Sequence, residues 1–165
     1  MALVEKITLI VMVAANVTNN VTNYAQVVNW ILEKAVTLDN VNMAREGDIY
    51  AQNYLEGLEY PMVFISATQP VTETENYWTY NLTLYYFDKI TEECQDRNAV
   101  DGIYIRSNGV TVLSKLVNLI RNADWVLDLG YDNSYHLFGE TAVFADMLLG
   151  VYTQIAVKVP KTTIC

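Results

Sequence analysis

Carboxylates are the most plentiful side chains in this sequence that could do chemistry, and one group of them is dense. Glu92, Glu93, Asp96 and Asp101 fall within ten residues of one another. Carboxylates grouped in this way could bind a cation or form an acidic patch, whereas a solvated loop would explain them without a function. Their spacing differs from that of an EF-hand calcium loop. The sequence therefore predicts no metal ligands and no catalytic pair among them.

The other candidates for catalysis lack suitable neighbours in the sequence. His136 is the only histidine, and it lies in a turn-rich segment, which favours a structural or solvent-facing role over a metal site. Cys94 directly follows two glutamates, whose negative charges disfavour the reactive thiolate. The serine-hydrolase motif G-x-S-x-G, the P-loop and G-x-G-x-x-G are all absent. We therefore predict no catalytic residue, no metal and no cofactor.

Aromatic residues are over-used, with 12 tyrosines among them. A tyrosine combines an apolar body with a polar tip, which suits half-buried strands and interfaces. Trp30, Trp78 and Trp125 could form a ligand platform, but aromatic residues at helical or alternating spacing are more typical of a core. These features favour a packing or assembly protein over an enzyme.

The formal net charge of −9, from 19 acidic and 10 basic residues, limits the partners of the chain. An acidic surface repels phosphate backbones, so a module that grips DNA is disfavoured, whereas a protein past which DNA slides is not. Solubility alone would also explain the charge. Cys94 and Cys165 form no C-x-x-C motif, and reduced thiols are expected.

The length of 165 residues and the hydrophobic content of 52% suit a single domain over residues 1–165. Residues 1–19 are predicted to form an N-terminal strand or arm. The run KITLIVMVAA also resembles the apolar part of a secretory signal, although Glu5 cancels the positive charge of Lys6. The run is shorter than the about 20 residues that span a bilayer, so no membrane association is expected.

Two stretches with helical periodicity are predicted to form the main helices. The first spans about residues 20–36, with Asn20 as its N-cap. Its predicted apolar stripe comprises Val21, Tyr24, Ala25, Val28, Ile31, Leu32 and Ala35. The second helix begins near Asn108 and ends near Arg121, which suits the helix dipole. Its predicted stripe comprises Val110, Leu113, Leu116, Val117 and Ile120.

Four segments are predicted to be strands: 61–66, 76–89, 124–130 and 151–159. The segment 76–89 alternates most regularly and is predicted to be central, with Leu82 and Leu84 buried. In 151–159, Ile155 and Val157 are predicted to be buried with them. The segments 37–59, 91–102 and 131–140 are interpreted as connectors. This order predicts an α+β fold, a mainly antiparallel sheet with two main helices packed on one face.

Several short motifs in this order resemble those of small ring-forming proteins of tailed phages. They are GDI at Gly47, YPMVFI at Tyr60, YYFDKI before the acidic loop, and the closing segment FADMLLGVYTQIAVKVPKTTIC. The closing segment is the most specific, with its Phe-x-Asp, Gly, alternating strand, Val-Pro and final Cys. The chain is similar, over about residues 45–165, to tail terminator, tail-completion and neck-ring proteins, including those of crAss-like gut phages.

The resemblance implies a structural virion protein, without catalytic residues, that assembles in the cytoplasm of a bacterial host. It implies a homo-oligomeric ring of six or twelve copies in the neck or tail. Portal, neck or tail proteins would be its partners, and genome DNA would pass through without being tightly bound. The acidic residues Glu92, Glu93, Asp96 and Asp101 would then face the lumen or a ring interface.

Two alternatives remain open from the sequence. A secreted or periplasmic small binding module would explain the signal-like N-terminus and the glycosylation triplets at Asn16, Asn20 and Asn81. An acidic enzyme with an unrecognised carboxylate pair is the third hypothesis.

Overall fold

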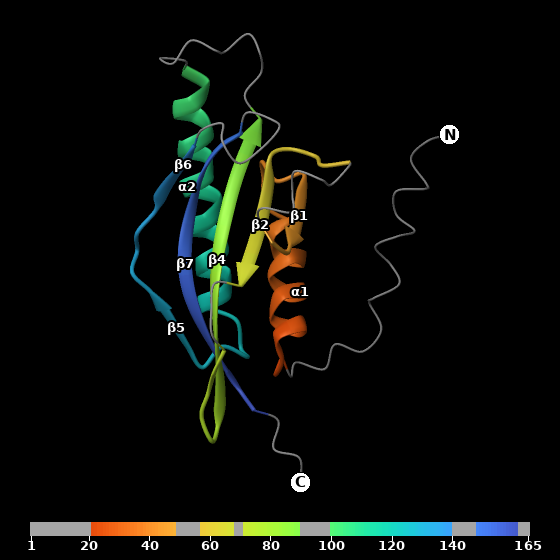
Figure 1. Ribbon diagram of the computed structural model, residues 1–165, viewed down its shortest axis with the longest axis vertical. Coiled ribbons are helices and arrows are strands. Elements are labelled where there is room, and N and C mark those ends of the chain that lie inside the picture. The colour runs from red at the N-terminus through yellow and green to blue at the C-terminus, as the bar shows by residue number, and fades with distance from the viewer. Residues whose placement is uncertain (1–20, 49–56, 68–70, 90–99, 140–147, 162–165) are drawn as a thin grey trace, which may run out of the picture.

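A computed structural model describes residues 21–48, 57–67, 71–89, 100–139 and 148–161. These ranges form helices and a seven-stranded sheet (Figure 1). The helices are α1 (Tyr24–Ala35) and α2 (Val100–Arg121). The strands are β1 (Met43–Glu46), β2 (Met62–Ala67), β3 (Thr72–Glu73), β4 (Tyr77–Lys89), β5 (Asp128–Tyr131), β6 (His136–Gly139) and β7 (Leu148–Pro160).

The sheet is mixed but mostly antiparallel, with the order β1-β2-β4-β7-β5, while β3 pairs with β4 and β6 pairs with β7. Only the β1–β2 pair of the described strands is parallel. The longest pairing joins β4 to β7, from Tyr77 opposite Pro160 to Lys89 opposite Leu148. The α+β prediction and the central place of the strand at 76–89 are therefore confirmed.

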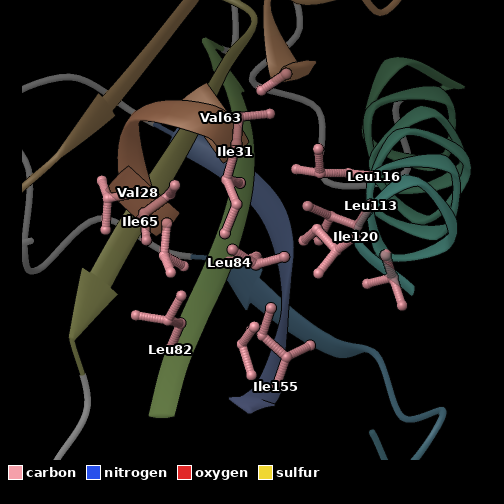
Figure 2. Close-up of a cluster of buried hydrophobic side chains, with 14 of the residues drawn as sticks. Val28, Ile31, Val63, Ile65, Leu82, Leu84, Leu113, Leu116, Ile120 and Ile155 are labelled. Atoms are coloured by element: carbon pink, nitrogen blue, oxygen red, sulfur yellow. The ribbon is translucent and has the colours of Figure 1, made fainter. Parts of the chain in front are cut away.

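Both helices lie on the same face of the sheet, as predicted, with α1 behind β1 and β2 and α2 behind β4 and β7 (Figure 1). Strand alternation directs every second side chain toward the helices. Leu82 and Ile155, which are direct partners, and Leu84 and Val157 are all buried there, as predicted. Figure 2 shows Leu82, Leu84 and Ile155 in one cluster with Leu113, Leu116 and Ile120 of α2.

The opposite face, which no described helix covers, is called the outer face below (Figure 1). Its side chains are the alternate residues of the same strands. A smaller buried cluster lies on it, formed by Met62, Phe64, Phe87 and Leu148. The sheet therefore has apolar packing on both faces near the start of β2.

The helix α1 begins at Tyr24, and its N-cap is Asn23, which corrects the prediction of Asn20. Asn23 Oδ1 accepts a hydrogen bond from Gln26 N, and Gln26 Oε1 accepts one from Asn23 N. This capping box satisfies backbone donors at the helix start. Ala25, predicted in the buried stripe, is exposed, while Val27 is buried. Asn20 lies outside the described residues.

The helix α2 begins at Val100, eight residues before the predicted start. Gly102 and Gly109 weaken its helical propensity, but a Cβ at Gly109 would lie only 2.6 Å from Val151 Cγ2. Glycine therefore lets the helix approach the sheet closely. Val110, predicted as part of the apolar stripe, is exposed. Neither described helix is long and apolar enough to cross a membrane.

The edge strands differ from their predictions. The strand predicted at 124–130 begins only at Asp128, and Trp125 lies before it, buried with its ring edge-on to Trp30. β6 lies in a segment interpreted as turns, and β1 in one interpreted as a polar connector. Both are four residues long. The predicted N-terminal strand or arm, residues 1–19, lies outside the described residues.

Candidate functional site

The four carboxylates predicted as a lumen or ring-interface patch are only partly placed. Glu92, Glu93 and Asp96 lie outside the described residues, and Asp101 belongs to the first turn of α2. The structure therefore leaves their arrangement untested. Within the described ranges, no three His, Cys, Asp or Glu residues gather in a way that could hold a metal ion.

A row of four aromatic side chains crosses the outer face of the sheet and is the most distinctive feature there. Phe64 of β2 is the register partner of Tyr85 of β4, which is opposite Tyr152 of β7, which is opposite His136 of β6. Successive ring centroids are 6.3, 5.5 and 4.9 Å apart. Aromatic pairs at such distances attract one another beyond their buried area. These four residues are called the aromatic row below.

Exposure increases along the aromatic row toward the edge of the sheet. Phe64 is fully buried, Tyr85 and Tyr152 are half-buried, and His136 is exposed. The imidazole of His136 is nearly parallel to the Tyr152 ring, at 23°. The buried end anchors the row in the smaller buried cluster, while the exposed end leaves ring surface accessible. His136 was predicted to be structural or solvent-facing, and it is both stacked and exposed.

Hydrogen bonds in the turn before β6 hold His136 in place. Ser134 Oγ lies 3.2 Å from His136 Nε2, and Ser134 N donates to Asp132 Oδ1 at 2.9 Å. The bonds from Ser134 lower the pKa of the Asp132 carboxyl. A Ser-His-Asp triad needs its carboxylate on the imidazole, whereas this carboxylate accepts from the serine. The three residues therefore stabilise a turn and position a ring, and their arrangement does not match that of an activated nucleophile.

A side chain of β7 also holds this turn through a hydrogen bond. Thr153 Oγ1 donates a hydrogen bond of 2.7 Å to the carbonyl oxygen of Ser134. Thr153 is fully buried. The hydroxyl thus satisfies its donor while tying the loop between β5 and β6 to the central strands. The turn that precedes His136, at the exposed end of the aromatic row, is consequently restrained by hydrogen bonds.

A shallow hollow of about 470 Å³ lies beside the aromatic row on the outer face. Asn81, Gln154 and Ala156 line it from β4 and β7, and Tyr131 and Asp132 line it from the β5 end. Gly130 also lines it, and a Cβ there would lie 3.2 Å from Ala156 Cβ. Because Gly130 has no side chain and its register partner Ala156 has only a methyl group, the surface is recessed here. Amide and carboxylate groups around it could accept a small polar ligand.

Two lysines lie at the far end of the sheet. Lys158 Nζ lies 3.4 Å from Asp128 Oδ2 and 4.6 Å from the centre of the Tyr77 ring. Lys161 Nζ lies 2.6 Å from Glu73 Oε1 and 4.6 Å from the Trp78 ring. Each ammonium is shared between a carboxylate and an aromatic ring, and such pairs contribute modestly at exposed sites. Lys161 thus joins the β3–β4 hairpin to the end of β7, and Lys158 joins β7 to the start of β5.

The aromatic row could be found only in part from the sequence. Alternation in 76–89 and 151–159 places Tyr85 and Tyr152 on the side away from Leu84 and Thr153, so both were assignable to the outer face. Their pairing depends on the register between distant strands. His136 could not be added, since the strand that carries it was interpreted as a turn.

Comparison with known protein families finds no matching family, and comparison with curated proteins finds no similar protein. The likeness to ring-forming phage proteins therefore rests on the sequence motifs alone.

Proposed function

We propose that this protein is a structural virion protein, a subunit of an oligomeric ring in the neck or tail of a tailed phage. In this proposal it connects head to tail in the manner of a tail terminator. Six or twelve identical copies surround a channel through which genome DNA passes without being tightly bound. Portal, neck or tail proteins contact the ring, which assembles in the host cytoplasm.

The aromatic row is the observation that carries the proposal. Aromatic residues are enriched in the centres of protein interfaces, where they supply contact area at low entropic cost. Here the rings are fixed by direct cross-strand contact on the long β4–β7 pair. A preorganised, half-exposed aromatic surface suits docking to a neighbouring protein, because little ordering remains to be done on binding.

The charge of the chain supports the same function. With a net charge of −9, the isolated subunit repels duplex DNA instead of condensing onto it. A channel protein needs this property, because tight contacts with phosphates would slow translocation. The charge supports a passive channel over a protein that grips the genome.

Purified virions of the phage that encodes the chain provide the test. Quantitative mass spectrometry should find the chain at a fixed ratio to the portal protein, and electron microscopy should place a ring of identical copies at the neck or tail. The lysate of infected cells, freed of particles, is the control fraction. Abundance in that lysate with absence from particles, or an isolated monomer in the particle, would overturn the proposal.

The hollow beside the aromatic row favours a second candidate, a secreted or periplasmic small binding module. Asn81, Gln154 and Asp132 present hydrogen-bonding groups there, next to aromatic surface. The mass of the mature intact protein separates the two candidates. Removal of about the first fifteen residues, as a signal peptidase would produce, favours the binding module, whereas a full-length chain in particles favours the ring subunit.

A further inference from the structure

The exposed side of α2 carries an unusual mixture of apolar and uncharged residues. Four of the eight large apolar side chains that are exposed in the described ranges belong to this helix: Ile103, Tyr104, Val110 and Leu119. Ile103 and Tyr104 are 69% and 61% exposed. Small polar residues lie between them on the same side, including Ser107, Thr111 and Asn118. This side of the helix is called the α2 surface below.

The α2 surface differs in charge from the rest of the chain. The helix contains Arg106, Lys115 and Arg121 and a single acidic residue, Asp101, although acidic residues outnumber basic ones 19 to 10 overall. Lys115 is exposed in the middle of the helix, and Arg121 lies over the Tyr131 ring, 5.8 Å from its centroid. The α2 surface is therefore a weakly cationic region on a strongly acidic protein.

An acidic region surrounds α1 and the edge strand β1. Its exposed carboxylates are Glu33, Asp39, Glu46, Asp48 and Glu59. The nearby cations are Lys34 and Arg45, and Lys34 lies over the Trp30 ring, 5.5 Å from its centroid. Carboxylates thus outnumber cations five to two in these described residues. This region is called the α1 flank below.

We propose that the α2 surface of one subunit binds the α1 flank of a second copy of this chain. The two regions have opposite charge, and α1 and α2 lie behind different halves of the sheet (Figure 1). One subunit can therefore use both regions at once. Such a contact is heterologous, and its repetition generates a ring if the rotation closes. The inference rests on the proposed ring function and identifies which surfaces form the lateral contact.

Charge complementarity distinguishes this partner from others. Apolar side chains on the α2 surface provide area that can be buried in the contact. The charge of Lys115 orients the acidic partner and raises the rate of association. Nucleic acid and a foreign acidic peptide could also meet a cationic helix. A second copy is favoured because it brings both the acidic flank and the high local concentration that an assembling ring requires.

Charge reversal in the full-length protein tests the contact. Lys115→Glu should weaken self-association about tenfold or more at low salt, because it sets like charges against each other. Glu33→Lys should weaken it similarly. An equimolar mixture of the two variants should recover association, since each then offers an oppositely charged partner to the other. Sedimentation velocity over a concentration series at two salt concentrations measures these effects.

Matched controls alter the same number of charges on the β3–β4 hairpin. Val71→Glu combined with Asn76→Glu matches the change made by Lys115→Glu, and Glu75→Lys matches Glu33→Lys. All three positions are exposed, and these controls should associate like the wild type. Equal weakening in controls and variants would show a general charge effect and overturn the inference.

The remaining outcomes separate this inference from the proposed function. Wild-type association that neither reversal changes would overturn the α2 contact and leave the ring proposal standing. A wild-type chain that stays monomeric at its highest soluble concentration would also overturn the inference, while microscopy of virions would still decide the ring. Salt-sensitive binding of a duplex DNA probe that Lys115→Glu abolishes would assign the α2 surface to nucleic acid.

Discussion

Tyr85 of β4 and Tyr152 of β7 are direct cross-strand partners, and their ring centroids are 5.5 Å apart on the outer face of the sheet. On the opposite face, the neighbouring positions Leu84 and Thr153 are buried under the helices. One strand pair thus builds the core with one set of side chains and the candidate interface with the other. The geometry of the candidate interface is therefore set by the longest strand pairing of the described sheet.

The Tyr85–Tyr152 contact should be measurable as an energetic coupling. In a double-mutant cycle, Tyr85→Ala and Tyr152→Ala should show a coupling of about 0.5–1.5 kcal/mol, because aromatic rings in contact attract beyond their buried area. Urea denaturation of the four proteins measures it. Tyr77, which lies farther along β4, is the control partner for Tyr152. A cycle with Tyr77→Ala should show no coupling, and equal couplings in both cycles would contradict a specific Tyr85–Tyr152 ring contact.

Truncation in the core should be much more costly than truncation on the outer face. Leu82 and Ile155 are register partners, with exposed fractions of 0% and 3%. Leu82→Ala and Ile155→Ala should each lower the free energy of unfolding by about 2–5 kcal/mol, because each leaves a cavity beneath the helices. The exposed Leu137→Ala is a matched control and should change it little. Near-wild-type melting of both core variants would show that the strands are misplaced.

Gly109 should tolerate no side chain. A Cβ there would lie 2.6 Å from Val151 Cγ2 and 2.8 Å from Tyr86 Cδ1, so α2 would have to move away from the sheet. Although alanine favours a helix over glycine, Gly109→Ala should destabilise the protein by about 1–3 kcal/mol through overpacking. Denaturant unfolding measures the change, and the exposed Ser107→Ala is the control. A stabilised Gly109→Ala variant would refute the close approach of helix and sheet.

The start of α2 was predicted eight residues too late because Gly102 lies in a segment interpreted as a connector. Helical propensity treats glycine as a weak point, whereas in the structure the helix continues through Gly102, where a Cβ would lie 3.3 Å from Leu149 Cδ1. The long strands β4 and β7 could be predicted, because regular alternation over 13 residues leaves little choice of structure. Helical propensity and hydrophobic periodicity depend only on residues close in the sequence. They therefore predict an element correctly where local sequence, and not a tertiary contact, determines it.

The short strands lacked such a signal. β1 and β6 have four residues each, too few for alternation to stand out from a loop, and both are fixed by pairing with distant strands. The same limit affected the candidate site, since Tyr85 and Tyr152 could be assigned to a face but not to each other. The aromatic row needs registers between β2, β4, β7 and β6, and these follow from the assembled sheet.

Tyr86 should make the protein sensitive to alkali. Burial, with a smaller contribution from the charge of Asp88, raises the pKa of Tyr86 from 10.0 to about 12. Because the folded state holds the phenol neutral, this contribution to stability is fully present below about pH 10 and is lost as the pH rises toward 12. Urea midpoints measured between pH 8 and pH 11 should fall, and less steeply in Tyr86→Phe.

The same substitution separates ionisation from packing. The Tyr86 hydroxyl is buried and has no hydrogen-bond partner in the described part of the chain. Tyr86→Phe should therefore leave stability at neutral pH unchanged or slightly higher, because an unsatisfied polar group is removed. Tyr24, Tyr80 and Tyr131, whose pKa values are also raised, should account for the slope that remains. A variant with the full wild-type slope would exclude Tyr86 as a source of the sensitivity.

The acidic loop provides a test of the channel itself. If the carboxylates face a lumen, the isolated protein should show no measurable affinity for duplex DNA near physiological salt, because like charges prevent counterion release. Reversing the loop should create salt-sensitive binding, measured by fluorescence anisotropy, and should slow genome packaging or ejection while rings still form. The reversed residues are Glu92, Glu93, Asp96 and Asp101. The matched control reverses exposed carboxylates outside both this loop and the α1 flank, at Glu73, Glu75, Asp124 and Asp128. Only the loop variant should impair packaging in virions, whereas both variants would gain some affinity in solution.

If the loop instead contacts a neighbouring ring, its reversal should abolish ring stacking before any DNA effect appears. Normal stacking and normal packaging in the loop variant would remove the loop from both roles and leave a solvated surface segment.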